Sequence, residues 1–287
     1  MSDVTVIGLG AMGSAIAKAF LNAGYSATVW NRSREKLDAF AKSGATCESD
    51  IVKAIAASPV AVVCIDDYAS TWALMEEHNL GQVLAGRTLV QFSTGTPEEA
   101  RQTLAGAELH DTAYLDGAIL AYPREVGHDA LITISGDEAV YASVRALLDA
   151  LSNDVRYLGT SIGSAAGLDI AVMSYYILTH IGLVQAALLC ESEGVRPDML
   201  ASVIVDSLPS DTEEIAHLGK ALQNNEFADP GASINVYSNI LDRIRAQSKD
   251  RNLDARIAEF ADGLYKEGVA RGFGDEEVVA LIKLLRR

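Results

Sequence analysis

Three glycines near the start of the chain have the spacing of a dinucleotide-binding turn. Gly8, Gly10 and Gly13 follow a short β-branched run and precede a stretch of helical character. In such a unit the first glycine permits the tight turn, the second lets a pyrophosphate approach the backbone, and the third allows close packing of helix and strand. The helix N-terminus then offers free N–H groups and a partial positive charge to the phosphates. The predicted contact residues of this turn are Gly8, Leu9, Gly10, Ala11 and Met12.

The end of the next expected strand, residues 27–30, selects the cofactor. An enzyme specific for NAD carries Asp or Glu here, whose carboxylate binds the ribose hydroxyls and repels a 2′-phosphate. This chain has Asn31, Arg32 and Ser33 instead, with Lys36 one helical turn later. The planar guanidinium of Arg32 and the hydroxyl of Ser33 suit a phosphate, and Lys36 adds a second cation. These four residues predict NADPH as the cofactor.

Composition narrows the classes of partner. The 287 residues are enough for two domains, and 23 Lys+Arg against 39 Asp+Glu give a net charge of −16. This charge disfavours nucleic acid and anionic membrane surfaces as partners and favours a cationic substrate. The 3 cysteines are widely spaced and lack a CxxC pattern, so we expect neither a disulfide framework nor a metal site. The first residues show no secretory signal pattern, which predicts a cytoplasmic protein.

The first half of the chain alternates β-branched segments with helical patterns, which is typical of a mostly parallel sheet covered by helices. The expected strands are residues 4–7, 27–30, 60–65, 88–92, 114–119, 131–135 and 155–158. Ligands of such sheets bind at the carboxyl ends of the strands. Residues at these ends complete the predicted cofactor contacts, with one neighbour assigned to the substrate pocket. The cofactor contacts are Cys64, Ile65, Asp66, Thr94 and Ala118, and the pocket residue is Ile119.

A long apolar stretch, residues 161–194, predicts a helix on the order of 45 Å long. Its length and apolarity also fit a transmembrane span. Asp169, His180 and Gln185 lie inside it and no Lys or Arg cluster flanks it, which disfavours that alternative. A helix that is apolar all round must be covered on every side in a soluble protein. We therefore expect a homodimer in which a second subunit covers it.

After Gly194 the chain has helical patterns only, expected at residues 197–208, 212–224, 233–247, 254–267 and 275–285. The predicted fold class is α/β, with a Rossmann-type dinucleotide-binding domain, a long interdomain helix and an all-helical C-terminal domain. The expected boundaries are 1–160 for the NADPH-binding domain, 161–194 for the helix, and 195–287 for the helical dimerisation and substrate domain.

Several motifs together resemble the NADPH-dependent imine reductases and reductive aminases over nearly the whole chain. The motifs are Gly8-Leu9-Gly10-Ala11-Met12-Gly13, Trp30-Asn31-Arg32-Ser33, Thr94-Gly95-Thr96-Pro97, Asp116-Gly117-Ala118-Ile119 with Pro123 and Gly127, and Gly163 followed by Asp169. The resemblance implies homodimers that exchange helical domains, with each active site between the nucleotide domain of one subunit and the helical domain of the other. It also implies that Thr94 contacts the nicotinamide ribose. Asn is common there in reductive aminases, so Thr94 favours reduction of preformed imines.

Asp169 decides the chemistry. The related β-hydroxyacid dehydrogenases carry a catalytic lysine at the matching position. Hydride delivery to a ketone creates alkoxide charge, which a carboxylate opposes. Delivery to an iminium discharges a cation, and a nearby carboxylate favours the protonated, electrophilic form. Asp169 is therefore predicted to be catalytic, as proton donor or as anionic anchor. The structural alternative is a carboxylate that only stabilises the start of the helix.

Other residues share the helical face of Asp169. Tyr176 lies seven residues later, within about 20° on a helix, and Met173 and His180 follow the same stripe. Tyr176 is predicted to be catalytic, and Met173 and His180 to line the substrate pocket. The alternatives are that Tyr175 and Tyr176 are core residues with bonded hydroxyls, and that His180 is a core histidine.

The predicted function is transfer of a hydride from NADPH to the C=N carbon of a cyclic imine or iminium. One alternative is an NADP-dependent relative of the β-hydroxyacid dehydrogenases that acts on carbonyls or alcohols, although its lysine is missing. The other is an NADPH sensor without catalysis, which needs Arg32 and Ser33 but no acid at Asp169.

Overall fold

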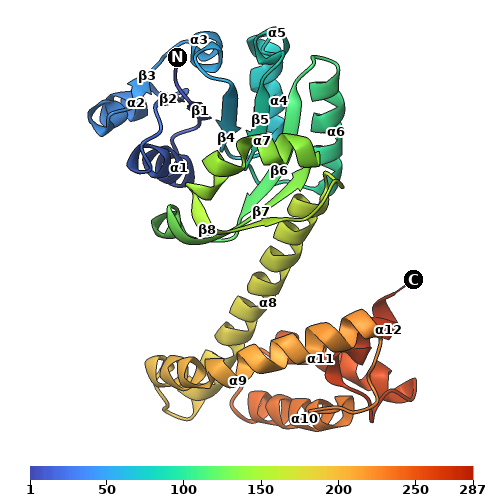
Figure 1. Ribbon diagram of the computed structural model, residues 1–287. Coiled ribbons are helices and arrows are strands. Elements are labelled where there is room, and N and C mark those ends of the chain that lie inside the picture. The colour runs from blue at the N-terminus through green and yellow to red at the C-terminus, as the bar shows by residue number, and fades with distance from the viewer. Residues whose placement is uncertain (287) are drawn as a thin grey trace. The chain divides into compact units, whose positions relative to one another are not determined.

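The computed structural model describes residues 1–286. The chain divides into two compact units, Met1–Tyr175 and Tyr176–Arg287. The first unit is a sheet covered by helices, and the second is built from helices (Figure 1). The helix α8 (Ser164–Ser192) begins in the first unit and ends in the second.

The sheet of the first unit has eight strands in the order β3-β2-β1-β4-β5-β6-β7-β8. All neighbours are parallel except β6 and β7, which are antiparallel. Because the strand order reverses between β1 and β4, the carboxyl ends of these two strands form the switch point where such sheets bind ligands. The strands are β1 (Val4–Ile7), β2 (Ala27–Trp30), β3 (Thr46–Cys47), β4 (Val60–Val63), β5 (Thr88–Gln91), β6 (Ala113–Ile119), β7 (His128–Gly136) and β8 (Ser152–Tyr157).

The predicted Rossmann-type sheet is confirmed, with differences at individual strands. β3 was not predicted, because its two residues are exposed and carry no apolar pattern. β4 ends at Val63, two residues before its expected end, because Cys64 and Ile65 already turn toward the following helix. β7 is longer than expected because it pairs with strands on both sides.

The helices of the first unit begin at capping side chains. Asp50, Asp67 and Asp137 each accept a backbone N–H at a helix start, and Thr96 forms a reciprocal capping box with Glu99. The helices are α1 (Ala11–Asn22), α2 (Arg34–Phe40), α3 (Ile51–Ala56), α4 (Tyr68–Glu77), α5 (Gly81–Leu84), α6 (Pro97–Glu108) and α7 (Glu138–Asp149), with the 3-10 turns η1 (Ala41–Ser43) and η2 (Pro123–Glu125). Their apolar faces and the sheet bury the main core, which includes Phe20, Val62, Leu115 and Ile132.

The second unit contains the helices α9 (Pro197–Asn224), α10 (Ile234–Asp250), α11 (Arg256–Ala270) and α12 (Ile282–Leu285), with the 3-10 turn η3 (Val278–Leu281). Its small core includes Phe227 and Ile234. The buried carboxylate of Asp262 joins α11 to α10 through Arg245 at 2.8 Å.

Three helix predictions for this unit are wrong. Residues 197–208 and 212–224 form one helix that contains Pro209. A proline removes the hydrogen bond to the carbonyl four residues earlier, here Val205, and this residue is exposed, so water can satisfy that carbonyl. The expected helix 275–285 starts later, because Glu277 caps the turn at the backbone N–H of Val278.

The long helix α8 confirms the expected length of the apolar helix. By length and composition alone it could cross a membrane. Few residues of its most apolar segment are buried within the chain. Beyond its first turns, its exposed apolar side chains include Ile170, Ile177, Leu178 and Val184. The surface of α8 therefore lacks the cover that an apolar helix needs in water.

Candidate cofactor and imine site

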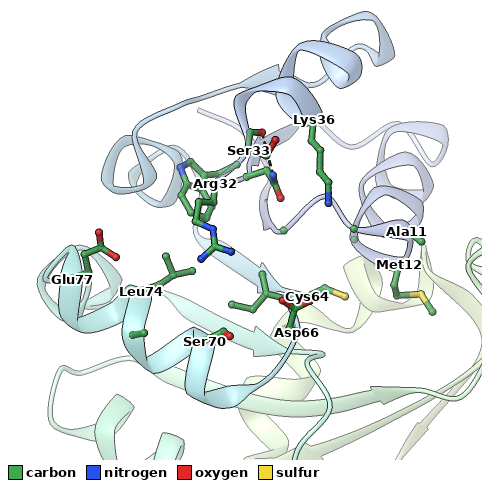
Figure 2. A pocket seen from close by; sticks show the side chains of 17 residues that line it. Ala11, Met12, Arg32, Ser33, Lys36, Cys64, Asp66, Ser70, Leu74 and Glu77 are labelled. Atoms are coloured by element: carbon green, nitrogen blue, oxygen red, sulfur yellow. Dashed lines mark hydrogen bonds between the residues drawn. The ribbon is translucent and has the colours of Figure 1, made fainter.

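A cavity of about 480 Å³ lies at the switch point of the sheet. Its walls are the β1–α1 turn, the residues after β2, the residues after β4, and one face of α4. Figure 2 shows the side chains of Arg32 and Lys36 pointing into this cavity. Eleven of the predicted cofactor contacts line it: Gly8, Gly10, Ala11, Met12, Asn31, Arg32, Ser33, Lys36, Cys64, Ile65 and Asp66.

Each glycine of the turn has a distinct geometric reason. Gly8 has φ +102°, and a Cβ there would lie 2.2 Å from the carbonyl oxygen of Cys64. A Cβ at Gly13 would lie 2.1 Å from the carbonyl oxygen of Gly8. A Cβ at Gly10 would meet nothing within 4 Å, and Gly10 lines the cavity. Gly8 and Gly13 are thus required by the fold, whereas Gly10 leaves open the space that a pyrophosphate needs.

Asn31 holds the turn in place. Its Oδ1 accepts the backbone N–H of Leu9 at 2.9 Å, and its Nδ2 donates to the carbonyl of Ser33 at 3.2 Å. The side chain of Leu9 is buried in the core, and Leu9, a predicted contact, does not line the cavity. Asn31 therefore links the pyrophosphate turn to the segment that carries Arg32.

The residues after β2 fit a 2′-phosphate. Arg32, Ser33 and Lys36 all line the cavity, and Ser33 is the N-cap of α2 without using its hydroxyl as a cap. The start of α2 adds the partial positive charge of a helix N-terminus. Two cations, a hydroxyl and a helix start thus line the same cavity as the glycine turn. The residues present fit NADPH.

Sequence reasoning missed the wall made by α4. Ser70, Ala73, Leu74 and Glu77 line the cavity from this helix. Their spacing of three, four and seven residues defines one helical face, which is the signal that could have identified them. Cys64 also lines the cavity. Burial raises the pKa of its thiol to about 12, so the thiol stays protonated and unreactive.

Three predicted residues on or just after β5 and β6 do not line this cavity either. Thr94 is exposed after β5, Ala118 is buried on β6, and Ile119 packs at the edge of the main core. The roles assigned to Thr94, Ala118 and Ile119 stay predictions.

Asp169 lies near the start of α8 with 8% of its surface exposed. Burial raises its pKa above the usual value of an aspartate. Within residues 1–286 no hydrogen bond or ion pair neutralises it. A buried carboxyl without a partner is a common feature of functional sites.

The other predicted residues of α8 are exposed in this chain: Met173, Tyr176 and His180. The interpretation of His180 as a core histidine is wrong for the single chain, because the middle of α8 is not covered by its own chain. The same exposure excludes Tyr175 and Tyr176 from the core of the chain.

A second buried carboxyl, Asp116 on β6, was not predicted as a site residue. It is 0% exposed and accepts the hydroxyl of Tyr68, the hydroxyl of Tyr114 at 3.4 Å and the backbone N–H of Ala166 at 3.1 Å. Burial raises its pKa to about 7, these hydrogen bonds oppose the rise, and the charge of Asp169 adds to it. The charge of Asp169 therefore acts on Asp116.

Family models cover both parts of the chain. Residues 3–159 match the NAD binding domain of 6-phosphogluconate dehydrogenase. Residues 161–287 match the C-terminal domain of NADPH-dependent reductive aminase-like proteins. The two matches meet at the start of the long helix.

Individual relatives match over the full length. An imine reductase from Myxococcus stipitatus, solved with NADP+, has 30% identity and a TM-score of 0.93, covering 99% of this chain and 100% of its own. A reductive aminase from Aspergillus terreus, solved with NADPH and ethyl levulinate, has 30% identity and a TM-score of 0.90, with 100% of both chains covered. An NADPH-dependent reductive aminase from Aspergillus oryzae is 26% identical over 99% of this chain and 97% of its own length.

Proposed function

This chain belongs to the family of NADPH-dependent imine reductases and reductive aminases, and we propose that it reduces cyclic imines or iminium ions with Asp169 as the acidic group. When bound, NADPH supplies the hydride, so that iminium and NADPH yield amine and NADP+. A neutral imine requires one further proton on its nitrogen.

The observation that carries the proposal is a buried, unneutralised carboxyl at Asp169. Its ionised form attracts the positive nitrogen of an iminium and favours protonation of a neutral imine. Its raised pKa also lets it hold a proton closer to neutral pH, where it can deliver that proton to the nitrogen. The ionised form favours C=N over C=O, because alkoxide formation beside a carboxylate is opposed.

The predicted contacts complete the proposed site. We assign the pyrophosphate to the Gly8–Met12 turn and the 2′-phosphate to Arg32, Ser33 and Lys36. Cys64, Ile65 and Asp66 border the adenosine ribose, and Thr94 and Ala118 the nicotinamide side. In the substrate pocket we place Tyr176 as a second catalytic group, together with Ile119, Met173 and His180.

A substrate panel tests the proposal. The chain is assayed with NADPH and cyclic imines, with NADPH and ketones, and with NADP+ and 2-hydroxy or 3-hydroxy acids. Absorbance at the NADPH band is followed in each assay. Consumption of NADPH only with the imines supports the proposal. Oxidation of hydroxy acids would instead favour the dehydrogenase alternative, and binding of NADPH without turnover of any substrate would favour the sensor.

Replacement of Arg32 by alanine is expected to raise the Kd for NADPH about 10- to 100-fold. The variant loses a charge-assisted hydrogen bond to the 2′-phosphate, which contributes roughly 1.5–3 kcal/mol. The Kd for NADH stays unchanged because NADH lacks that phosphate. Fluorescence titration with both cofactors measures the two constants. Arg34→Ala is the matched control, since Arg34 is exposed on α2 and does not line the cavity; an unchanged preference in Arg32→Ala would refute the assignment.

We also propose that the chain is a homodimer that covers α8. The exposed apolar side chains on this helix include Ile177, 59% exposed, and Leu178, 60% exposed, at its middle. A continuous apolar surface of this kind marks an interface, and a second copy of the same chain is the commonest partner in closed symmetric assemblies. The free state of Cys47, Cys64 and Cys190 is compatible with the cytoplasmic location that we propose.

Analytical ultracentrifugation tests this arrangement. The chain is expected to sediment at twice the mass of one chain, and the double variant Ile177→Lys/Leu178→Lys at the mass of one. Gln223→Lys, an exposed position on α9, is the control and is expected to stay dimeric. A single-chain mass for the unmodified protein would contradict the proposal.

A further inference from the structure

We propose that Asp116 is a positioning residue for Asp169, because its carboxylate caps the first turn of α8 from the sheet. The inference rests on the function proposed for Asp169. It assigns a role in the reaction to a residue that does not line the cofactor cavity.

The start of α8 depends on side chains from outside the helix. The backbone N–H of Ala166 donates to Oδ2 of Asp116 at 3.1 Å, and that of Ala165 donates to Oγ of Ser135 at 3.1 Å. The hydroxyl of Ser135 also donates to the carbonyl of Ile162 at 2.7 Å. These N–H groups of a first helical turn have no partner within the helix, and an acceptor with negative charge stabilises them.

The two capping residues form one unit of the sheet. Asp116 on β6 is the register partner of Ser135 on β7, and on its other side it is the partner of Gln91 on β5. All three side chains are 0% exposed. A row of three polar side chains thus crosses three neighbouring strands inside an apolar core. Two of them, Asp116 and Ser135, accept N–H groups from the start of α8.

The cap acts on Asp169 through a short stretch of rigid helix. Asp169 lies three residues after Ala166, so both lie on the same face of α8. The turn is also packed tightly, since a Cβ at Gly163 would lie 2.9 Å from Cβ of Pro97 on α6. A hydrogen bond that fixes Ala166 therefore fixes the position of the Asp169 side chain one turn later.

The same carboxyl connects α8 to a wall of the cofactor cavity. The hydroxyl of Tyr68, the first residue of α4, donates to Oδ1 of Asp116, and later residues of α4 line the cavity. Gly95 makes this contact possible, because a Cβ there would lie 2.2 Å from the ring of Tyr68. Asp116 thus holds both the helix that carries the proposed acid and the helix that borders the cofactor.

The ionisable groups around Asp116 agree with this role. Tyr68 from α4, Tyr114 from its own strand and Asp169 from α8 face it, and Glu99 from α6 acts on Tyr68. Burial raises the pKa of both tyrosines, so they remain protonated donors to the carboxyl. The two tyrosines therefore remain able to donate to the Asp116 carboxylate wherever that carboxylate is ionised.

The test compares Asp116→Ala with Asp116→Asn. Alanine leaves the Ala166 N–H without an acceptor, whereas the asparagine amide can still accept it and donate to Tyr68. With a cyclic imine as substrate, kcat is expected to fall about 10-fold in Asp116→Ala and at most about threefold in Asp116→Asn, a rescue that follows from restored hydrogen bonding. In Asp116→Ala the Kd for NADPH is expected to rise as well, because Tyr68 on α4 loses its acceptor, and in Asp116→Asn it is expected to stay within about twofold because the amide donates to Tyr68.

Two further variants separate positioning from loss of stability. Thr5→Val removes a buried hydroxyl that donates to the carbonyl of Ala54 at 2.6 Å and does not contact α8, so it is expected to lower Tm without changing kcat. Ser135→Ala removes the other cap while Asp116 is intact, and kcat is expected to fall about threefold. Ser135→Ala keeps the test decisive if Asp116→Ala does not fold.

The ionisation of Asp169 gives a readout that does not depend on activity. In protein labelled with ¹³C at the aspartate carboxyls, the Asp169 signal is the one lost in Asp169→Asn. Both Asp116 variants lose the charge that faces Asp169, so positioning is read from the difference between them. The Asp169 midpoint is expected to lie at least about half a pH unit lower in Asp116→Ala than in Asp116→Asn, because a loosened turn admits water. Equal midpoints in the two variants together with an equal kcat overturn the proposal. If Asp169→Asn retains full activity, the function proposed for Asp169 fails, and the midpoint alone still decides whether Asp116 positions it.

Discussion

Replacement of Asp169 by alanine is expected to lower kcat for a cyclic imine by about 100-fold or more. A positioned acid or base contributes on the order of 10²–10⁴ to the rate of such a reaction. Asparagine at this position keeps the size but has neither the charge nor the proton, so Asp169→Asn is expected to lose nearly as much. Steady-state kinetics with saturating NADPH measure the effect.

The Asp169→Ala replacement is expected to lower turnover of the imine without weakening the binding of NADPH. Asp169 does not line the cavity that fits NADPH, so the Kd for NADPH should remain within about twofold. Ser174→Ala, an exposed position on the same helix, is the control for a change in α8 itself and is expected to keep its kcat. Wild-type turnover in Asp169→Ala would contradict the proposed role of Asp169 as the acidic group.

Replacement of Gly13 by alanine is expected to damage both stability and cofactor binding. The added Cβ would lie 2.1 Å from the carbonyl oxygen of Gly8, so the turn has to open. Overpacking of this kind costs about 3 kcal/mol, which corresponds to a fall in Tm of roughly 6–12 °C for a domain of this size. Because the opened turn no longer presents its N–H groups to the pyrophosphate, the Kd for NADPH is expected to rise at least about 10-fold.

Two other glycines give matched controls for this result. Gly10→Ala adds a methyl group to open space beside the cavity, so the Kd for NADPH should rise while the free energy of unfolding falls by at most about 1 kcal/mol. Gly106→Ala, in the open interior of α6, should stabilise the chain by about 0.5–1 kcal/mol and leave binding unchanged. Thermal unfolding and NADPH titration of the three variants check the set. Equal behaviour of Gly13→Ala and Gly106→Ala would contradict the geometry assigned to the turn.

The cofactor end of the site was predictable because it depends on local sequence. A glycine turn needs particular residue types at fixed spacing, and Gly8, Gly10 and Gly13 satisfy that rule within six residues. Arg32 and Ser33 follow at the end of the next strand, where the parallel arrangement of the sheet puts them beside the turn. Asn31 shows the limit of this reasoning, since its bond to the Leu9 backbone is a contact across 22 positions of the chain.

Long-range contacts account for what sequence reasoning missed. Asp116 and Ala166 are 50 positions apart, and the pattern around Asp116 gives no sign that it caps a later helix. The wall formed by α4 was within reach of periodicity, but only the fold shows that this face borders the cavity. The continuous helix α9 was not predictable from propensity, because Pro209 is a strong signal for a break.

The helix α8 was predictable from local sequence in its length but not in its exposure. Its length followed from an unbroken apolar stretch, and the helix Ser164–Ser192 confirms it. The exposure of His180 did not follow, because the apolar pattern indicates that a helix is covered but not by which chain. The proposed roles of Met173, Tyr176 and His180 therefore depend on the partner subunit that we propose for this helix.

The most direct measurement is the fate of the hydride. The chain is incubated with a cyclic imine and NADPH that carries deuterium in both C4 positions, and the product is analysed by mass spectrometry. We expect an amine with one deuterium, located on the carbon that formed the C=N bond. An amine without deuterium, or label recovered only in an alcohol made from an added ketone, would contradict hydride transfer from NADPH to the C=N carbon.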